Sequence, residues 1–276
     1  MIHLLSEKGR QALGGLAARP LLYAFDFDGT LAPISPDRDA VTLPGETGGW
    51  LTELAKRATC AVISGRSLAD LAPRVSGSVP HLIGNHGIES PLSSPETLRL
   101  AEEVCEQWRC EIANGQAPSM AAAGGEIEDK RYTLTVHFRG APDPAAACAR
   151  ALQILNRLTP LPFLIMGKQS INVLPPGQAG KGSAASALMT HLHRDGLFYI
   201  GDDETDETVF SLTEGLVMGV RVGAVNGSRA RYYLDHQGEV QEVLRLLTRH
   251  LEPAAALGDS DAAGKAGQVH EMSRGS

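Results

Sequence analysis

Short apolar runs recur along the chain between segments of helical periodicity, and this alternation constrains the fold more than any other feature. The runs are apolar on both faces, which is typical of parallel strands in the middle of a sheet. Strands that alternate with helices predict an α/β fold built on a parallel sheet. The predicted central strands are residues 21–25, 60–64, 81–84, 197–201 and 217–223.

Amphipathic helices are predicted to cover this sheet. Leu68, Leu71 and Val75 recur at helical spacing behind Ser67, a residue type that caps helix N-termini. A second helix is predicted near the end of the chain from the same spacing of Val240, Val243, Leu244, Leu247 and Leu251.

The middle of the chain has a different pattern. Residues 132–138, YTLTVHF, alternate strictly between apolar and polar side chains, which predicts a half-exposed strand of an antiparallel sheet. A helical segment and a second strand-like stretch at 168–174 follow. We therefore predict an inserted α+β cap at residues 91–176 between two core segments, 1–90 and 177–252, and a disordered tail at 253–276.

Composition excludes several classes of protein. The 276 residues are 43% hydrophobic and can bury a sizeable core, whereas a net charge of −7 argues against a nucleic-acid partner. No run of 18 apolar residues occurs, and Glu7, Lys8 and Arg10 interrupt the apolar start. Neither a membrane span nor a signal peptide is expected, and a cytoplasmic location follows as a prediction. The oligomeric state is not predictable from these features.

Carboxylates gather where the predicted strands end. Ligands bind at the carboxyl ends of strands in open parallel sheets. The residues at these ends are Asp26, Asp28, Ser64, Asp202 and Asp203. Two carboxylates at 4 Å repel by roughly 4 kcal/mol at an effective dielectric near 20, so such a cluster needs a cation. Oxygen ligands without nearby Cys or His favour Mg²⁺ over zinc.

A metal held by carboxylates commonly binds a phosphate, and the remaining residues fit that use. Lys181 opens a predicted helix and could hold phosphoryl oxygens together with Ser64. Asp26 could attack phosphorus, while Asp28 protonates the leaving oxygen and then activates water. Arg66 is expected to cap a loop or pair with a core carboxylate.

Four segments, in order, resemble the motifs of the haloacid dehalogenase-like phosphatases: DFDGT (26–30), ISGR (63–66), Lys181 and GDDETDE (201–207). Each alone could be a turn or a helix N-terminus, and only the ordered set is specific. The resemblance covers residues 20–235 and implies a Rossmann-like core. It also implies Mg²⁺ as cofactor and an aspartyl-phosphate intermediate on Asp26.

The same resemblance implies a role for each motif residue. The catalytic residues are Asp26 as nucleophile, Asp28 as general acid/base, and Thr30, Ser64 and Lys181 as contacts to the phosphoryl group. The metal residues are Asp26, Asp28 through its backbone carbonyl, and Asp202, supported by Asp203 and Asp206.

Three longer stretches resemble trehalose-6-phosphate phosphatases: GNHGIE (84–89), EDKRYTLTVHFR (128–139) and GDDETDETVF (201–210). The resemblance implies Mg²⁺-dependent hydrolysis of trehalose 6-phosphate, a small sugar phosphate, to trehalose and phosphate under a mobile cap, in trehalose biosynthesis. The implied substrate contacts are Asn85, His86, Glu89, Glu128, Lys130, His137, Arg139 and Asn172. On the alternative interpretation, the polar residues of 132–139 are the solvated face of the cap sheet.

One segment departs from this family. Members of the family usually have a Glu-hydrophobe-Arg-Pro segment where this chain has NVLP (172–175). Asn172 stands in place of the glutamate and Leu174 in place of the arginine. Asn172 can still accept hydrogen bonds, more weakly than a carboxylate, but Leu174 cannot replace arginine. Sucrose phosphate and mannosyl- or glucosyl-glycerate phosphates are therefore alternative substrates. A phosphomutase and a non-catalytic sugar-phosphate sensor are alternative functions.

Overall fold

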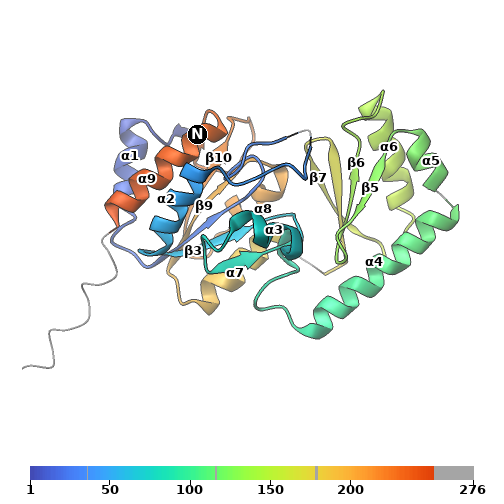
Figure 1. The fold of residues 1–276 in the computed structure, drawn as a ribbon, viewed down its shortest axis with the longest axis horizontal. Coiled ribbons are helices and arrows are strands. Elements are labelled where there is room, and N and C mark those ends of the chain that lie inside the picture. The colour runs from blue at the N-terminus through green and yellow to red at the C-terminus, as the bar shows by residue number, and fades with distance from the viewer. Residues whose placement is uncertain (36, 116, 178–179, 252–276) are drawn as a thin grey trace, which may run out of the picture.

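The computed structural model describes residues 1–35, 37–115, 117–177 and 180–251, arranged as two lobes side by side (Figure 1). One lobe contains a seven-stranded sheet with the order β1-β11-β10-β9-β2-β3-β4, and the other a four-stranded sheet with the order β5-β6-β8-β7. The predicted α/β fold with a separate α+β part is confirmed. The predicted tail at 253–276 lies outside the described residues.

Every pairing in the seven-stranded sheet is parallel. The five predicted central strands are all present, as β2, β3, β4, β9 and β10. Two short strands, β1 at one edge of the sheet and β11 beside it, were not predicted because two or three residues carry no readable pattern. The strands are β1 Ile2–His3, β2 Leu21–Phe25, β3 Thr59–Ile63, β4 His81–Ile83, β9 Gly196–Gly201, β10 Leu216–Val222 and β11 Tyr232–Leu234.

Helices cover both faces of this sheet, and alternate residues of β2 show how. Tyr23 and Phe25 pack in one apolar cluster with α1, α2 and α9, while Leu22 and Ala24 pack in another with α7 and α8. Ser67 caps α3 as predicted, since its side chain accepts a hydrogen bond from the Asp70 amide. The helices are α1 Glu7–Gly14, α2 Gly45–Ala55, α3 Leu68–Val75, α7 Gly180–His191, α8 Glu207–Phe210 and α9 Val240–His250.

Short 3₁₀ helices connect several strands to the α-helices that follow. They are η1 Asn85–Gly87, η2 Glu204–Asp206 and η3 Gln237–Glu239. None of the helices in the described parts of the chain combines the length and apolar character that crossing a membrane requires.

The four-stranded sheet is antiparallel throughout and packs against helices on one face. Trp108 from α4 is fully buried among Leu134, Val136 and Val173 of the sheet. The elements of this lobe, which we call the cap, are α4 Pro95–Gly115, α5 Ala117–Ala122, β5 Glu126–Asp129, β6 Leu134–His137, α6 Pro144–Leu155, β7 Phe163–Gly167 and β8 Ser170–Leu174. The predicted limits of the cap, 91 and 176, remain a prediction.

The apolar face of the alternation around β6 was interpreted correctly, whereas the exposure expected of its polar face was wrong for Thr133 and Thr135 though not for His137 and Arg139. Leu134 and Val136 lie in the cap core, as predicted. The opposite face was expected to be half exposed, but Thr133 and Thr135 are 0% and 2% exposed. The other lobe covers this face, because Thr133 donates a hydrogen bond to Asn85.

Candidate active site

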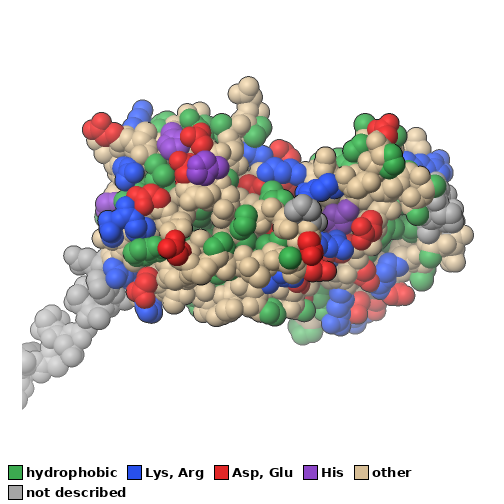
Figure 2. Space-filling view, turned by 45° about the horizontal axis from the view of Figure 1, so that its top comes forward, with side chains coloured by type: hydrophobic (Ala, Val, Ile, Leu, Met, Phe, Trp, Pro, Cys, Tyr) green, Lys and Arg blue, Asp and Glu red, His purple; other side chains and the backbone are tan. Residues whose placement is uncertain are grey.

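The carboxyl ends of β2, β3 and β9 face the polar side of the cap sheet across a cavity of about 1030 Å³. In Figure 2, acidic, basic and histidine side chains gather where the two lobes meet. The predicted residues that line this cavity are Asp26, Asp28, His86, Glu128, Lys130, His137, Arg139, Asn172, Lys181, Asp202 and Asp203. Absent from the cavity wall are Thr30, Ser64, Asn85, Glu89 and Asp206.

An acidic centre lies at the floor of the cavity. It contains three buried aspartates, Asp26, Asp202 and Asp206. Each contributes one carboxylate oxygen, and these three oxygens lie within 4.8 Å of one another. Burial, with the neighbouring carboxylates, raises the pKa of Asp26 well above its usual value despite the opposing charge of Lys181. Burial is also the main reason that the pKa of Asp202 rises to about 6. A bound cation would offset this repulsion.

The three carboxylates of the centre are not equally available to a cation. Asp206 uses both oxygens within the protein: Oδ1 accepts from Lys181 and Tyr199, and Oδ2 accepts from the amides of Asp202 and Asp203. In contrast, Asp26 Oδ2 and Asp202 Oδ1 accept no hydrogen bond from any described residue. Asp206 therefore anchors the centre, and Asp26 and Asp202 offer the open oxygens.

Asp203 adds an oxygen to the same region. Its Oδ1 is buried and has no hydrogen-bond partner among the described residues, and burial raises the pKa of its carboxyl group. A buried carboxylate oxygen without a partner is costly unless water or an ion satisfies it. The donor set of this centre therefore fits Mg²⁺, which prefers oxygen ligands and retains several waters.

Lys181 joins two carboxylates of the acidic centre. It lies in the first turn of α7, is 2% exposed, and its Nζ donates to Asp26 Oδ1 at 2.7 Å and to Asp206 Oδ1 at 2.8 Å. Burial alone would lower the pKa of this ammonium group, but the two carboxylates outweigh burial and raise it. Lys181 therefore remains positively charged beside Asp26, the predicted nucleophile.

Arg66 holds the second aspartate of the DFD segment. Its Nε and Nη2 donate to the two oxygens of Asp28, each at 2.7 Å, in a bidentate pair. The same guanidinium group donates to Asp70 at 2.6 Å and to the backbone carbonyl of Arg38 at 2.9 Å. The predicted pairing of Arg66 with a core carboxylate is confirmed, and Asp28 stays at the cavity wall.

The two predicted hydroxyl contacts to phosphate lie just behind the cavity wall. Ser64 is 1% exposed, and its Oγ accepts a hydrogen bond from the Arg66 amide. Thr30 is fully buried, and its Oγ1 has no hydrogen-bond partner in the described chain. Their roles as phosphate contacts remain predictions.

Asn85 and Glu89 connect the core to the cap. The Asn85 amide donates to Glu89 Oε2 at 2.7 Å and to the Lys130 carbonyl at 3.1 Å, and it accepts from Thr133 at 2.6 Å. Glu89 also accepts from the Leu68 amide. Neither side chain lines the cavity, and both join the two lobes in this structure, while their role as contacts to the sugar remains a prediction.

His86 lies beneath the loop that carries the ISGR motif. Its backbone has φ of +56°, and a Cβ atom at Gly65 would come within 2.5 Å of its ring, so a side chain at position 65 would displace the ring. Burial, and then the charges of Lys130 and Lys181, lower the pKa of His86 well below its usual value, against a smaller effect of Asn172. His86 therefore presents a neutral imidazole to the cavity.

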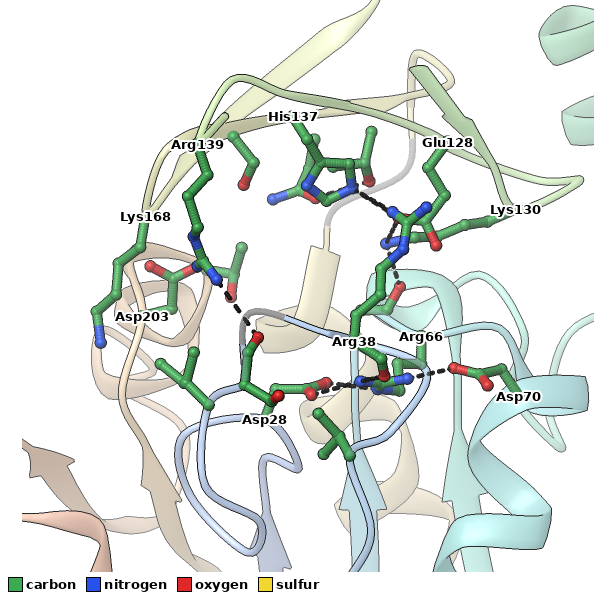
Figure 3. Close-up of a pocket in the computed structure, with 18 of the residues that line it drawn as sticks. Asp28, Arg38, Arg66, Asp70, Glu128, Lys130, His137, Arg139, Lys168 and Asp203 are labelled. Atoms are coloured by element: carbon green, nitrogen blue, oxygen red, sulfur yellow. Dashed lines mark hydrogen bonds and ion pairs between the residues drawn. The ribbon is translucent and has the colours of Figure 1, made fainter. Parts of the chain in front are cut away.

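A charged cluster forms the cap wall of the cavity (Figure 3). Glu128 Oε2 lies 2.8 Å from His137 Nε2 and 2.8 Å from Arg38 Nη1, and 3.7 Å from Lys130 Nζ. Burial would raise the pKa of Glu128, but the hydrogen bond with His137 and the positive charges around it lower the pKa to about 2. Lys130 also reaches the core, where it donates to the Gly65 carbonyl at 3.0 Å.

Two residues of this wall were missed in the sequence. Arg38 comes from the loop after the DFDGT segment, and Lys168 comes from the turn between β7 and β8. Lys168 Nζ lies 2.5 Å from Asp202 Oδ2, so a cap residue contacts the acidic centre. Arg38 lies in a connection without periodicity, whereas Lys168 was placed at the start of a predicted strand, 168–174, and the structure leaves it in the turn before β8. Arg139, in contrast, makes one hydrogen bond within the described chain, an exposed bond of 3.5 Å to the Ser35 carbonyl.

The two departures from the family pattern lie in different surroundings. Asn172 lines the cavity and accepts a hydrogen bond from Thr135 at 3.1 Å. Leu174 is fully buried and does not line the cavity. Of the two substitutions, Asn172 is therefore the one that changes the cavity wall.

Comparisons with known proteins agree with this geometry. The fold is similar to the C-terminal domain of trehalose-6-phosphate phosphatase from Candida albicans, with a TM-score of 0.69 and 24% identity over 90% of this chain and 98% of that one. The parallel core sheet, with an acidic edge that faces a separate antiparallel lobe, has the fold of the haloacid dehalogenase-like class.

Sequence comparisons narrow the class to a family. A family model described as Trehalose-phosphatase matches residues 24–237, and the chain belongs to this family. It is 33% identical to a trehalose-phosphate phosphatase of Mycobacterium tuberculosis over 88% of this chain, and spans 66% of that relative's length, just under two thirds. It is 30% identical to the trehalose-6-phosphate phosphatase of Escherichia coli over 83% of this chain and 86% of that protein.

Proposed function

We propose that this protein hydrolyses trehalose 6-phosphate to trehalose and phosphate. The observation that carries the proposal is the single cavity between an acidic centre with a buried lysine and a cap wall rich in hydrogen-bonding groups. A phosphate ester bound there would have its phosphoryl group near Asp26 and Lys181 and its sugar against the cap. The names of the family members cited above support the choice of trehalose.

The chemistry begins at Asp26. One carboxylate oxygen forms a bond to phosphorus, the bond from phosphorus to the sugar oxygen breaks, and Asp28 gives the leaving oxygen its proton. Water then attacks the aspartyl-phosphate and transfers a proton to Asp28, which releases phosphate and restores Asp26. Lys181 balances negative charge throughout, because it already donates to Asp26.

The cofactor in this proposal is Mg²⁺, held by Asp26, Asp202 and the backbone carbonyl of Asp28, with Asp203 and Asp206 in support. When bound, it neutralises phosphoryl oxygens and so favours attack by an anionic nucleophile. Ser64 and Thr30 are proposed as further phosphoryl contacts, which requires a small movement because neither lines the cavity here.

Sugar recognition is proposed for the cap wall. Glu128 remains ionised at neutral pH, since its pKa is about 2, and so can accept hydrogen bonds from sugar hydroxyl groups. The remaining proposed sugar contacts are His86, Lys130, His137, Arg139 and Asn172. The cavity of about 1030 Å³ is large enough for a disaccharide phosphate.

Phosphate release from a panel of esters tests the proposal. The panel is trehalose 6-phosphate, sucrose 6-phosphate, glucose 6-phosphate and glucosyl-glycerate phosphate, with and without Mg²⁺, and with Asp26→Asn as the control. A Mg²⁺-dependent preference for trehalose 6-phosphate supports the proposal. A preference for another sugar would mean that Asn172 marks a changed specificity, and binding without release would favour the sensor function.

A further inference from the structure

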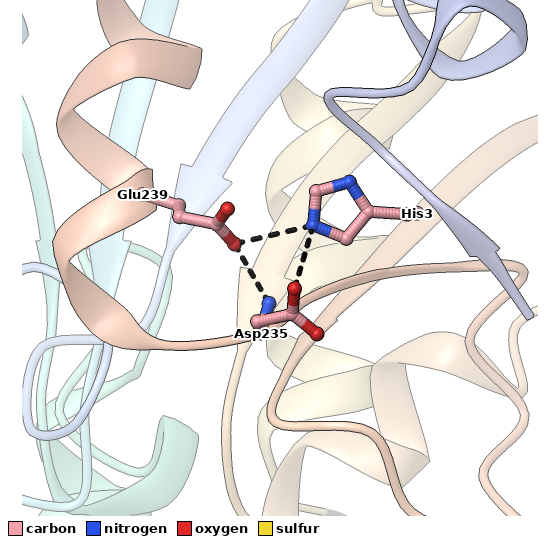
Figure 4. A group of neighbouring side chains, drawn as sticks. All are labelled: His3, Asp235 and Glu239. Carbon is pink, nitrogen blue, oxygen red and sulfur yellow. Dashed lines mark hydrogen bonds and ion pairs between the residues drawn. The ribbon is translucent and has the colours of Figure 1, made fainter.

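A second group of metal-ligating side chains lies outside this cavity wall, at the β1–β11 edge of the core sheet. His3 is in β1, Asp235 directly follows β11, and Glu239 ends η3 (Figure 4). The imidazole comes from near the N-terminus and the two carboxylates from residues 235 and 239, and the three side chains point toward one another. Among the described residues, this and the acidic centre are the two groups whose donor atoms all fall within 4.8 Å of one another.

The separations within this group match ligands of one ion better than hydrogen-bond partners. His3 Nε2 lies 3.4 Å from Asp235 Oδ2 and 3.4 Å from Glu239 Oε2. Nε2 is buried and makes no hydrogen bond within the described chain. Two ligands at about 2.1 Å from a tetrahedral Zn²⁺ ion stand about 3.4 Å apart. A hydrogen bond between the same atoms would be about 2.7–3.2 Å long.

The surrounding structure holds the three side chains in place. The His3 ring packs edge-on against Tyr233, with ring centroids 5.2 Å apart, and the Leu4 amide donates to the Tyr233 carbonyl. Glu239 Oε2 accepts a hydrogen bond from the Asp235 amide at 2.7 Å. Ligating carboxylates are commonly oriented by such additional hydrogen bonds.

We propose that His3, Asp235 and Glu239 form a second divalent-cation site, which binds Zn²⁺ with water as a further ligand. This site differs from the acidic centre in its ligand types and therefore in the metal ion that it prefers. Three carboxylates favour Mg²⁺, whereas one imidazole nitrogen and two carboxylate oxygens favour a borderline-soft ion.

An ion at this site would also steady the turn that follows the nucleophile candidate. Gln237, between the two carboxylate ligands, donates to the carbonyls of Thr30 and Leu31 at 3.0 and 3.2 Å. Asp235 and Gln237 line a small cavity of about 290 Å³ together with Asp202. The ion thus ties β1, β11 and the start of α9 to the active-site edge of the sheet.

Calorimetric titration of Zn²⁺ into the tag-free full-length chain, with Mg²⁺ in large excess to occupy the acidic centre, tests this proposal. We expect one equivalent of Zn²⁺ to bind, and at least about tenfold weaker binding in His3→Gln and in Glu239→Gln. His250→Gln, a histidine of α9 outside the group, is the matched control and should bind like wild type. Asp202→Asn should also retain the site, because it alters only the acidic centre.

Two further readouts separate a metal site from an ion pair. Co²⁺ in the site should give the visible absorption of a tetrahedral ion, which His3→Gln should lose, and Zn²⁺ should raise the Tm of wild type but not of this variant. Equal Zn²⁺ affinity in wild type and His3→Gln would overturn the proposal, as would loss of binding in Asp202→Asn alone. A wild-type chain that binds no Zn²⁺, with a lower Tm in His3→Gln, would show an ion pair only.

Discussion

The two walls of the large cavity hold their charges in different ways. In the core wall, the side chains of Asp26 and Lys181 are 6% and 3% exposed, and that of Asp206, just behind this wall, is 0% exposed. In the cap wall, those of Glu128 and His137 are 25% and 30% exposed, and Arg38, which reaches them from a core loop, is 41% exposed. Buried charges with fixed partners suit a reaction that needs one geometry, whereas partly hydrated charges can exchange partners with sugar hydroxyl groups.

The largest expected effect is at the core wall. Asp26→Asn should lower kcat by at least about 10³-fold on every ester, because the amide cannot form the acyl phosphate. The fold should survive, since the exchange is nearly isosteric and removes a carboxylate whose pKa burial has raised. Phosphate release measures the loss of kcat, and thermal unfolding shows whether the fold is retained. Activity close to that of wild type would disprove the aspartyl-phosphate mechanism.

Lys181→Met should inactivate the protein and also destabilise it. Removing the ammonium group leaves Asp26 and Asp206 buried without their shared partner, which costs about 3–5 kcal/mol in the free energy of unfolding. When Lys181→Met is made in the Asp26→Asn background, urea denaturation should show a smaller decrease in the free energy of unfolding. Asp206 is then the one buried carboxylate of the pair that has lost its partner. Equal losses in both backgrounds would mean that the two residues are not coupled.

Substitutions at the cap wall should separate substrates rather than abolish chemistry. Arg38→Ala and His137→Ala should each lower kcat/KM for trehalose 6-phosphate by about 10- to 100-fold, the range of one hydrogen bond to a charged group. The loss on p-nitrophenyl phosphate should be much smaller, because this ester has no sugar. Arg139→Ala should also lower kcat/KM more for trehalose 6-phosphate than for p-nitrophenyl phosphate, but by a smaller factor, since its hydrogen bond to the Ser35 carbonyl is long and exposed. Equal losses on both esters would argue against sugar recognition by this wall.

The smallest expected effect is a pH dependence of stability in the cap wall. The pKa of Glu128 is lowered from 4.5 to about 2, so its ionised form stabilises the folded state above pH 4.5. This contribution should be lost as the pH falls from 4.5 toward 2. Urea denaturation should therefore show wild type more stable than Glu128→Gln at neutral pH, with the difference fading over this range. A difference that stayed constant would mean that Glu128 carries no linked proton.

The core wall was predictable from the sequence and the cap wall was predictable only in part. Asp26 and Asp202 each follow an apolar strand, so the rule for parallel sheets brings them to one edge. The burial of Thr133 was missed, because alternation within a strand does not reveal that another lobe covers the polar face. Arg38 and Lys168 were missed because their positions depend on how the two lobes meet.

The residues that join the lobes show the same limit. Asn85 and Glu89 were predicted from the family resemblance to contact the sugar, and the sequence could not reveal that both side chains also join the two lobes. Glu89 accepts hydrogen bonds from the Leu68 backbone amide and the Asn85 side chain, and only the folded structure reveals these bonds. The strands β1 and β11, which hold His3 and precede Asp235, were too short to predict, so the second metal-ligating group was not visible either.

The bonds among Asn85, Thr133 and Glu89 have a mechanical consequence. The hydrogen bonds are short, and Asn85, which makes both of them, is fully buried. A cap rotation that preserves these bonds must therefore turn about Asn85 as a pivot. The contact between Arg139 and the Ser35 carbonyl is long and exposed, so we expect it to break early in such a rotation. A sugar phosphate would then enter at the rim beside Arg139, with its phosphoryl group leading toward Asp26.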